Sequence, residues 1–307
     1  MEKIPVLLTS FIRPKFLSQL LDILEKRSDI DIYFASDGPR NKSDQDKINE
    51  CLGLFQQSKF HLPPNRYMIH NKNYGTKFGL IKNIDWFFSH NEYGIVLEDD
   101  CKPNDLFFES MKESLLTHIK SDRYMMVSGS NYLPENENPT KNFYRESYFP
   151  MVWGWASWAN KWSLYKLGIP DIKQIVSKTA NKLYGNKISF EKTLFNNIFT
   201  KRFSEVNNGI LETWDYSLMA SMWRNNLFAL QSNFNMVKNI GFGKDAAHTT
   251  GKPPKWVPKE YVMPLKSIQT ELIDEKTLHY DRWLAKNVYN CNVREVVKNE
   301  IKRMVGR

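Results

Sequence analysis

The 307-residue sequence has few cysteines and no long apolar segment. Its three cysteines, Cys51, Cys101 and Cys291, are too few and too widely spaced for a disulfide framework or a cysteine-based zinc site. No stretch approaches the roughly 20 apolar residues that span a bilayer, and the opening residues hold too short an apolar run for a signal peptide. These absences favour a reducing compartment, and we expect a soluble, cytoplasmic protein.

Charge of one sign is only mildly in excess: 43 Lys and Arg residues stand against 34 Asp and Glu residues, a net charge of +9. A surface of mixed sign suits an anionic small molecule such as a nucleotide at least as well as a polymer. Because the sequence has no helix-turn-helix, zinc-finger or RNA-recognition signature, we expect no nucleic-acid partner.

The C-terminal segment is the most basic part of the chain, with six basic and two acidic residues over 286–307. Apolar residues at helical spacing predict a helix over 293–305, and Arg294, Lys298 and Lys302 form a stripe beside its apolar face. Peripheral contact with an anionic membrane is one interpretation of this stripe. The other is the solvated face of a packed helix.

Strand and helix signals alternate along the first half of the chain. This alternation predicts an α/β fold with a mostly parallel central sheet and helices on both faces. The expected strands are 4–9, 31–36, 66–70, 94–98 and 123–128, and the expected helices are 15–25, one that begins at Ser43, 77–88 and 104–120.

The pattern changes after about residue 130, where an aromatic block begins at Tyr144. We expect helices over 190–202 and 214–225, short strands near 227–231 and 234–239, and a loop over 241–258. The sequence favours one continuous α/β unit with an elaborated C-terminal half over two independent domains.

The strongest chemical signal is the triplet Glu98-Asp99-Asp100, which follows the apolar strand 94–97 directly. Ligands of open α/β sheets gather at the carboxyl ends of strands. Three adjacent carboxylates repel one another, so a cation or a hydrogen-bond network is needed to hold them together. Carboxylate oxygens completed by phosphate and water describe a Mg²⁺ or Mn²⁺ site. The alternative is a solvated acidic turn that caps the next helix.

Several segments in a fixed order give the chain a family resemblance. The run 94–103 looks like the metal-binding carboxylate motif of GT-A glycosyltransferases, and the whole resembles the bacterial family 2-like enzymes related to N-acetylglucosaminyltransferase I. The resemblance covers residues from about 4 to 250. The other segments that carry it are Thr9-Ser10-Phe11-Ile12-Arg13-Pro14, Asp37-Gly38-Pro39, the segment 73–79, Trp153-Gly154-Trp155-Ala156-Ser157-Trp158, Glu212-Thr213-Trp214-Asp215, and Gly241-Phe242-Gly243 through His248-Thr249.

The resemblance implies a site for a divalent cation, Mn²⁺ or Mg²⁺, and a nucleotide-sugar donor, with a UDP-sugar the first choice. Asp100 is the first candidate metal ligand, with Glu98 beside it and His248 as a further ligand; a loop histidine without a role is the alternative for His248. Asp99 is expected at the ribose or in the metal shell. The nucleotide is expected to contact Thr9, Arg13, Asp37, Asn73, Gly75 and Lys77, although Arg13 and Lys77 could also be ordinary surface cations.

On the acceptor side, a carboxylate must take the proton of the attacking hydroxyl. The resemblance makes Asp215 the candidate base and Glu212 its rival; either could instead be a first-turn acid that stabilises a helix. Of the clustered rings Trp153, Trp155 and Trp158, we expect at least one at the sugar or acceptor site, whereas core packing is the commoner fate of Trp.

The resulting hypothesis is a metal-dependent, inverting glycosyltransferase that acts on a glycan or lipid-linked acceptor in bacterial surface polysaccharide assembly. It is expected to transfer a hexosyl or N-acetylhexosaminyl group. Residues 1–130 would bind the nucleotide-sugar, 131–260 would form the acceptor half of the same domain, and 261–307 would be a basic helical extension. The rival hypotheses are a metal-dependent nucleotidyltransferase or phosphodiesterase and a non-catalytic carbohydrate-binding protein.

Overall fold

A computed structural model of the chain describes residues 3–134, 142–243, 253–254, 256–258, 270–272 and 274–293. Its centre is a nine-stranded sheet in the order β11-β7-β9-β6-β8-β4-β1-β2-β3. Five of the eight neighbouring pairs are parallel and three are antiparallel. The predicted α/β fold with a mostly parallel central sheet is thereby confirmed. His248 and the basic stripe of the expected C-terminal helix lie outside the described residues.

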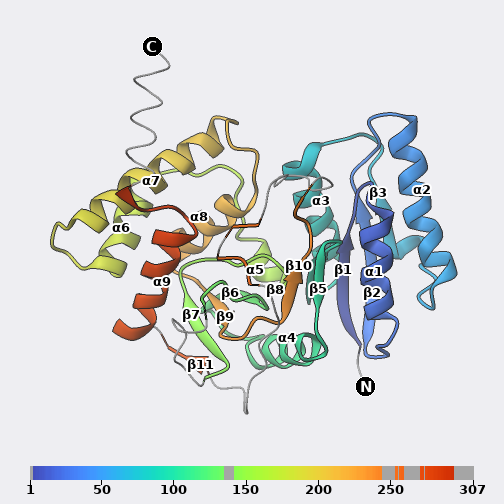
Figure 1. Ribbon diagram of the computed structural model, residues 1–307, viewed down its shortest axis with the longest axis horizontal. Helices are drawn as coiled ribbons and strands as arrows, with labels where there is room; N and C mark the ends of the chain where they lie inside the picture. The colour runs from blue at the N-terminus through green and yellow to red at the C-terminus, as the bar shows by residue number, and fades with distance from the viewer. Residues whose placement is uncertain are drawn as a thin grey trace.

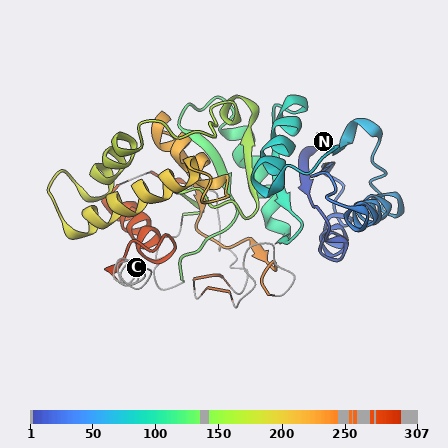
Figure 2. The ribbon, with the colours of Figure 1, turned by 90° about the horizontal axis from the view of Figure 1, so that it is seen from above.

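The N-terminal half of the sheet consists of four parallel strands that alternate with helices (Figure 1). The helices α1 and α2 cover one face of these strands and α3 covers the other, as the view from above shows (Figure 2). The strands are β1 (Ile4–Thr9), β2 (Ile30–Ser36), β3 (Tyr67–Ile69) and β4 (Tyr93–Glu98), and the helices are α1 (Pro14–Leu24), α2 (Lys42–Gln57), the 3₁₀ helix η1 (Pro64–Arg66) and α3 (Gly75–His90).

The C-terminal half adds strands of both directions. β8 (Trp155–Trp158) runs antiparallel between β4 and β6 (Tyr124–Ser128), and β9 (Phe228–Ser232) lies parallel to β6. β7 (Tyr144–Ser147) and β11 (Thr270–Glu271) complete that edge. The helices are α4 (Asp105–Thr117), α5 (Ala159–Trp162), α6 (Ile172–Tyr184), α7 (Phe190–Asn207), α8 (Asp215–Asn225) and α9 (Glu275–Asn287).

A second, two-stranded sheet links the two halves beside the central sheet. In it β5 (Cys101–Pro103), which follows the acidic triplet, pairs antiparallel with β10 (Val237–Asn239). Asn239 lies opposite Cys101 in this pairing. The sheet therefore brings the chain after residue 239 next to the triplet.

Most elements predicted in the N-terminal half are present within a few residues of their expected bounds, but one start signal was assigned wrongly. The N-cap of α2 is Asn41, whose side chain accepts a hydrogen bond from the Asp44 N–H at 3.0 Å, and not Ser43. In the C-terminal half the sequence did not predict β7 and β8, which lie in the aromatic block, or α6.

The described part of the expected basic extension belongs to the main core. In α9 the side chains of Tyr280, Leu284 and Ala285 are buried. Asp281 accepts hydrogen bonds from the Ser147 hydroxyl at 2.5 Å and from the backbone N–H of Tyr148 at 2.8 Å. α9 is thus fastened to the edge of the central sheet at β7. No helix within the described ranges is both long enough and apolar enough to cross a membrane.

Candidate active site at the carboxyl ends of the parallel strands

The acidic triplet lies where the chain reverses its direction of travel across the sheet. From β1 the chain moves to β2 and β3 on one side and then returns to β4 on the other side of β1. Ligands of open α/β sheets bind in the crevice at such a switch point. Thr9 at the end of β1 pairs with Glu98 at the end of β4, and the Asp99 N–H donates to the Thr9 carbonyl at 3.0 Å. Thr9 and the triplet therefore meet at the crevice, as the sequence predicted.

Asp99 is the buried member of the triplet, with a side chain 0% exposed. The Ser10 hydroxyl donates to its Oδ2 at 2.5 Å and Arg13 Nε donates to the same oxygen at 3.2 Å, while Arg13 Nη2 pairs with Oδ1. Burial raises the pKa of Asp99 to about 7, against the opposing charge of Arg13. The protein thus encloses the Asp99 carboxylate, which holds Ser10 and Arg13. A contact of Asp99 with the ribose or the metal shell stays a prediction.

Asp100 is partly accessible, with 14% of its side chain exposed. Arg13 Nη1 donates to its Oδ2 at 3.0 Å, and Asn239 Nδ2 donates to its Oδ1 at 3.4 Å. The Cα of Gly241 is so close that an added Cβ would lie 2.2 Å from Asp100 Oδ2. Asp100 is thus held between the turn after β1 and the segment after β10, and a side chain at 241 would displace its carboxylate.

Glu98 is the last residue of β4 and is partly buried. Burial raises its pKa to about 8, and the negative charges of Asp100, Asp99 and Asp215 add to the effect while Arg13 opposes it. Burial and the neighbouring carboxylates therefore favour the protonated form of Glu98. The charge of Asp215, 117 positions along the chain, makes the smallest of these contributions.

The carboxylates of the triplet fit a divalent cation that takes most of its ligands from substrate phosphates and water. Within the described ranges, no three His, Cys, Asp or Glu side chains converge on a point that could hold a metal ion. Mg²⁺ is nevertheless commonly bound by one or two carboxylates together with substrate phosphates and water. Asp100, with Glu98 at its side, meets that requirement, so a cation held jointly with a diphosphate is compatible with these residues.

Asp37, Asn73 and Gly75 are brought together at the N-terminus of α3. The carboxylate of Asp37 accepts hydrogen bonds from the N–H groups of Gly38 at 2.9 Å, Tyr74 at 2.9 Å and Gly75 at 2.8 Å. Asn73 Nδ2 donates to the Gly38 carbonyl at 2.8 Å. Asp37 therefore caps α3 and joins it to the turn after β2, a structural role that the sequence did not indicate.

Lys77 lies in the first turns of α3 and is only 6% exposed. No carboxylate of the described residues lies within ion-pair distance of its ammonium group, whose recorded neighbour is the Phe78 ring, 5.3 Å away. A cation this deeply buried is costly unless an anion accompanies it. The buried position of Lys77 therefore distinguishes it from an ordinary surface cation, and its contact with the nucleotide stays a prediction.

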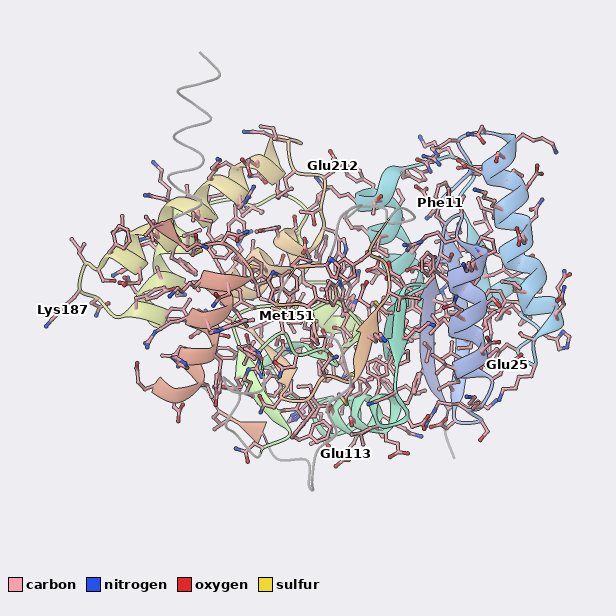
Figure 3. The ribbon with its side chains drawn as sticks, viewed as in Figure 1. Phe11, Glu25, Glu113, Met151, Lys187 and Glu212 are labelled. Atoms are coloured by element: carbon pink, nitrogen blue, oxygen red, sulfur yellow. The ribbon has the colours of Figure 1, made fainter. Side chains whose placement is uncertain are left out.

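The two candidate bases differ in their surroundings. Asp215 is the first residue of α8, partly buried; it accepts a hydrogen bond from the Tyr216 N–H at 2.9 Å and one from the Thr213 hydroxyl. Its charge contributes to the raised pKa values of both Glu98 and Tyr132. Glu212 is exposed, and Figure 3 shows it at the edge of the molecule. Asp215 is therefore the better fixed of the two carboxylates, and its role as the base stays a prediction.

The tryptophan cluster divides into core and surface. Trp155 and Trp158 are each 1% exposed. Trp155 packs on Trp214 with ring centroids 5.6 Å apart, and Trp158 Nε1 donates to the Leu115 carbonyl at 3.0 Å. Trp155 and Trp158 therefore pack in the core, and of the three rings Trp153 is the one left for the predicted contact at the sugar or acceptor site.

Trp153 instead belongs to a partly exposed aromatic cluster beside the triplet. It stacks on Trp256 at 5.8 Å and contacts Phe242 at 5.8 Å and Tyr132 at 4.7 Å. Phe242 directly follows the glycine that abuts Asp100. The sequence did not predict Tyr132, Phe242 or Trp256 as members, because they come from three distant segments with no shared local pattern.

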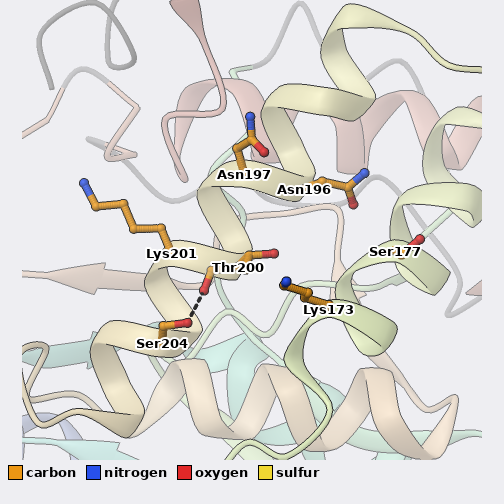
Figure 4. A pocket seen from close by; sticks show the side chains of 7 residues that line it. All are labelled: Lys173, Ser177, Asn196, Asn197, Thr200, Lys201 and Ser204. Atoms are coloured by element: carbon orange, nitrogen blue, oxygen red, sulfur yellow. Dashed lines mark hydrogen bonds between the residues drawn. The ribbon is translucent and has the colours of Figure 1, made fainter. Parts of the chain in front are cut away.

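The described residues also contain a separate polar groove of about 460 Å³ between α6 and α7 (Figure 4). It is lined by Lys173 and Lys201 and by the amides of Asn196 and Asn197, among others. None of the residues of the acidic triplet or the aromatic cluster lines it. The groove is therefore not part of the crevice at the switch point.

Comparisons with known proteins give weak likenesses in structure only. No protein-family model matches the sequence, and no curated protein matches it either. Among solved structures, the chain is similar to the mannosyltransferase PcManGT from Pyrobaculum calidifontis in complex with GDP-Man and Mn²⁺, with a TM-score of 0.37 and 8% identity over 72% of this chain and 69% of that one. It is also similar to S. aureus TarS 1-349, with a TM-score of 0.35 and 10% identity over 68% of this chain and 75% of that one. Likenesses of this size carry no functional argument, so the interpretation of the site depends on its own geometry.

Proposed function

We propose that the chain is a glycosyltransferase that moves a sugar from a nucleotide-sugar to a hydroxyl group of a glycan or lipid-linked acceptor. The observation that carries the proposal is the arrangement at the switch point. There a partly accessible carboxylate, Asp100, stands at the end of the parallel strands. The negative charge of Asp215, the first residue of α8, contributes to the raised pKa of the adjacent Glu98. Asp100 would hold the cation that stabilises the departing diphosphate, and Asp215 would accept the proton of the attacking hydroxyl group.

On the donor side, Asp100 would hold a divalent cation together with the donor's diphosphate. A bound Mn²⁺ or Mg²⁺ would neutralise the charge that develops on the departing diphosphate. Lys77, a buried cation without a carboxylate partner in the described ranges, is placed to add positive charge near the phosphates. Arg13 holds both Asp99 and Asp100 and so sets the position of the accessible carboxylate. A UDP-sugar stays our first choice of donor, by the resemblance alone.

On the acceptor side, Asp215 would take the proton of the hydroxyl group as that group attacks the anomeric carbon. Its position in the first turn of α8 and its hydrogen bonds with Thr213 and Tyr216 fix the carboxylate in one orientation. The aromatic cluster of Tyr132, Trp153, Phe242 and Trp256 offers flat apolar faces against which a sugar ring can pack. Inversion at the anomeric carbon follows if Asp215 is the base.

The experiment that tests the donor half is thermal unfolding of the full chain with UDP, GDP, CMP or ADP, each with and without Mn²⁺. A ligand that binds only the native state, at 100 times its Kd, adds about 2.7 kcal/mol of stability. We expect a Mn²⁺-dependent shift with one nucleotide and its loss in Asp100→Asn. Asp46→Asn is the matched control, because Asp46 is an exposed acid on α2 with 61% of its side chain accessible.

Two results would contradict the proposal. An Asp100→Asn variant with unchanged Mn²⁺-dependent affinity would remove Asp100 from the cation site. No shift with any nucleotide would instead favour a non-catalytic carbohydrate-binding protein, which the aromatic cluster alone could support.

A further inference from the structure

The loop between α6 and α7 carries two of the most exposed large apolar side chains in the described residues. Ile188 is 93% exposed and Phe190 is 59% exposed, only two positions apart. We name residues 185–190 the α6–α7 tip. It projects at the end of the molecule opposite α2 in Figure 1, and Figure 3 shows Lys187 at its extremity.

Internal hydrogen bonds fix the shape of this tip. The ammonium group of Lys192, a residue only 8% exposed, donates to the carbonyls of Gly185 at 2.8 Å and Asn186 at 3.2 Å. Ser189 caps α7 by accepting a hydrogen bond from the backbone N–H of Lys192 at 3.2 Å. Because the backbone on both sides of Ile188 is tied down in this way, the exposure of the apolar side chains is built into the fold.

The charge of the α6–α7 hairpin shows what kind of surface would accept this tip. Residues 172–207 contain seven Lys and Arg residues and two Glu residues, a net charge of +5 out of +9 for the chain. Of these, Lys192 is buried, Lys201 and Arg202 pair with Glu205, and Glu191 next to Phe190 is exposed. Lys187 lies within the tip, and Lys178 is exposed on the adjoining helix. Apolar side chains that protrude from a basic surface are the pattern of peripheral proteins that bind anionic lipid.

We propose that the α6–α7 tip docks on an anionic lipid bilayer, with Ile188 and Phe190 entering the interface and Lys187 lying among the headgroups. Two isolated side chains with one flanking charge give reversible binding rather than permanent anchoring. The proposal is independent of the proposed transferase activity, because the tip includes no residue of the crevice at the switch point.

The test is co-sedimentation of the full chain with large unilamellar vesicles of phosphatidylcholine alone or of phosphatidylcholine and phosphatidylglycerol at 7:3. We expect binding to the anionic vesicles that weakens as salt is raised. The double variant Ile188→Ser/Phe190→Ser should lower the partition coefficient by a factor of about 10 or more, since it removes most of the apolar area that enters the interface. The control Leu116→Ser, an apolar residue of α4 that is 44% exposed, should leave it unchanged.

Three outcomes would overturn the proposal. They are failure of the wild type to bind anionic vesicles, equal binding of the double variant, and equal loss in the Leu116 control. A fourth outcome would replace the proposal. If the wild type self-associates in light scattering, the double variant does not, and neither binds vesicles, the tip is an interface between copies of the chain. Urea unfolding checks that the exposed substitutions leave the fold intact. Nucleotide binding should survive in the tip variant and vesicle binding in Asp100→Asn, so the two proposals can fail separately.

Discussion

In the N-terminal half of the sheet, β1, β2, β3 and β4 follow one another along the chain, all parallel and each separated from the next by a helix. In the C-terminal half, β8 lies between β4 and β6, and β7 lies between β9 and β11. Neighbours in space are therefore distant in sequence, and parallel and antiparallel pairs are mixed. The first arrangement is built from local units, whereas the second depends on contacts that only the completed fold provides.

The two halves also bury different kinds of side chain. β1 is buried through apolar residues such as Val6, Leu7 and Leu8. In β7 the residues Arg145, Glu146 and Ser147 are each 0% exposed. Buried polar groups must find partners, and here Glu146 pairs with Arg123 and accepts from the Tyr124 hydroxyl at 3.0 Å. The C-terminal half is therefore held by a polar network as well as by packed rings.

The largest effect is expected from removing one of those rings. Trp155→Ala should lower the free energy of unfolding by about 3–5 kcal/mol, because the indole is 1% exposed and packs between Trp162 and Trp214. Urea unfolding followed by circular dichroism measures this. Trp153→Ala is the matched comparison, and it should cost much less because the Trp153 ring is partly exposed. Equal costs for the two variants would show that the division into core and surface rings is wrong.

The same contrast explains how much of the fold could be predicted. Apolar runs and helical periodicity predicted β1, β2, β4 and the helices between the N-terminal strands, because those patterns depend on near neighbours in sequence. The strand β7, Tyr-Arg-Glu-Ser, contains no apolar pattern, and its burial depends on partners such as Asn233 and Asp281 that lie far along the chain. No local signal could have identified it.

For the candidate site, the sequence predicted the positions better than the roles. The triplet, Thr9 and Asp37 lie at or just after the ends of strands, and Arg13 and Asp215 lie at the starts of helices. Whether a carboxylate faces solvent, as Asp100 does, or is enclosed, as Asp99 is, depends on Ser10 and Arg13 closing over it. The difference in exposure depends on side-chain packing, which cannot be predicted from the spacing of residues in the sequence.

The second prediction separates the two halves by function. If the N-terminal half binds the donor and the C-terminal half supplies the base, Asp215→Asn should lower sugar transfer by a factor of about 10² or more while leaving Mn²⁺-dependent nucleotide binding unchanged. Glu212→Gln is the control, because Glu212 is exposed. Transfer rates with a responsive donor and calorimetric nucleotide affinity are the two measurements. Near wild-type transfer in Asp215→Asn would require another base.

The smallest expected effect concerns the polar network that fastens α9 to β7. Burial raises the pKa of Asp281 to about 6, although hydrogen bonds from Ser147 and Tyr148 and the charge of Arg145 oppose the shift. The native state therefore holds this proton more tightly than the unfolded chain, in which the pKa is about 3.9. The stabilising contribution of the protonated group is fully present below pH 4 and is lost as the pH rises through 6. Between pH 4.5 and 7 the wild type should lose about 2 kcal/mol relative to Asp281→Asn, which cannot ionise.

Urea unfolding of both proteins at several values of pH measures this difference directly, and the subtraction cancels the groups that they share, including Glu98 and Asp99. Glu275→Gln on the same helix is the control, because the Glu275 side chain is 80% exposed. A difference between wild type and Asp281→Asn that stays constant with pH would mean that Asp281 is ionised throughout. The hydrogen bonds from Ser147 and Tyr148 and the charge of Arg145 would then lower the pKa of Asp281 by more than burial raises it. The polar network of the C-terminal half would in that case hold an ionised carboxylate, as surface ion pairs do.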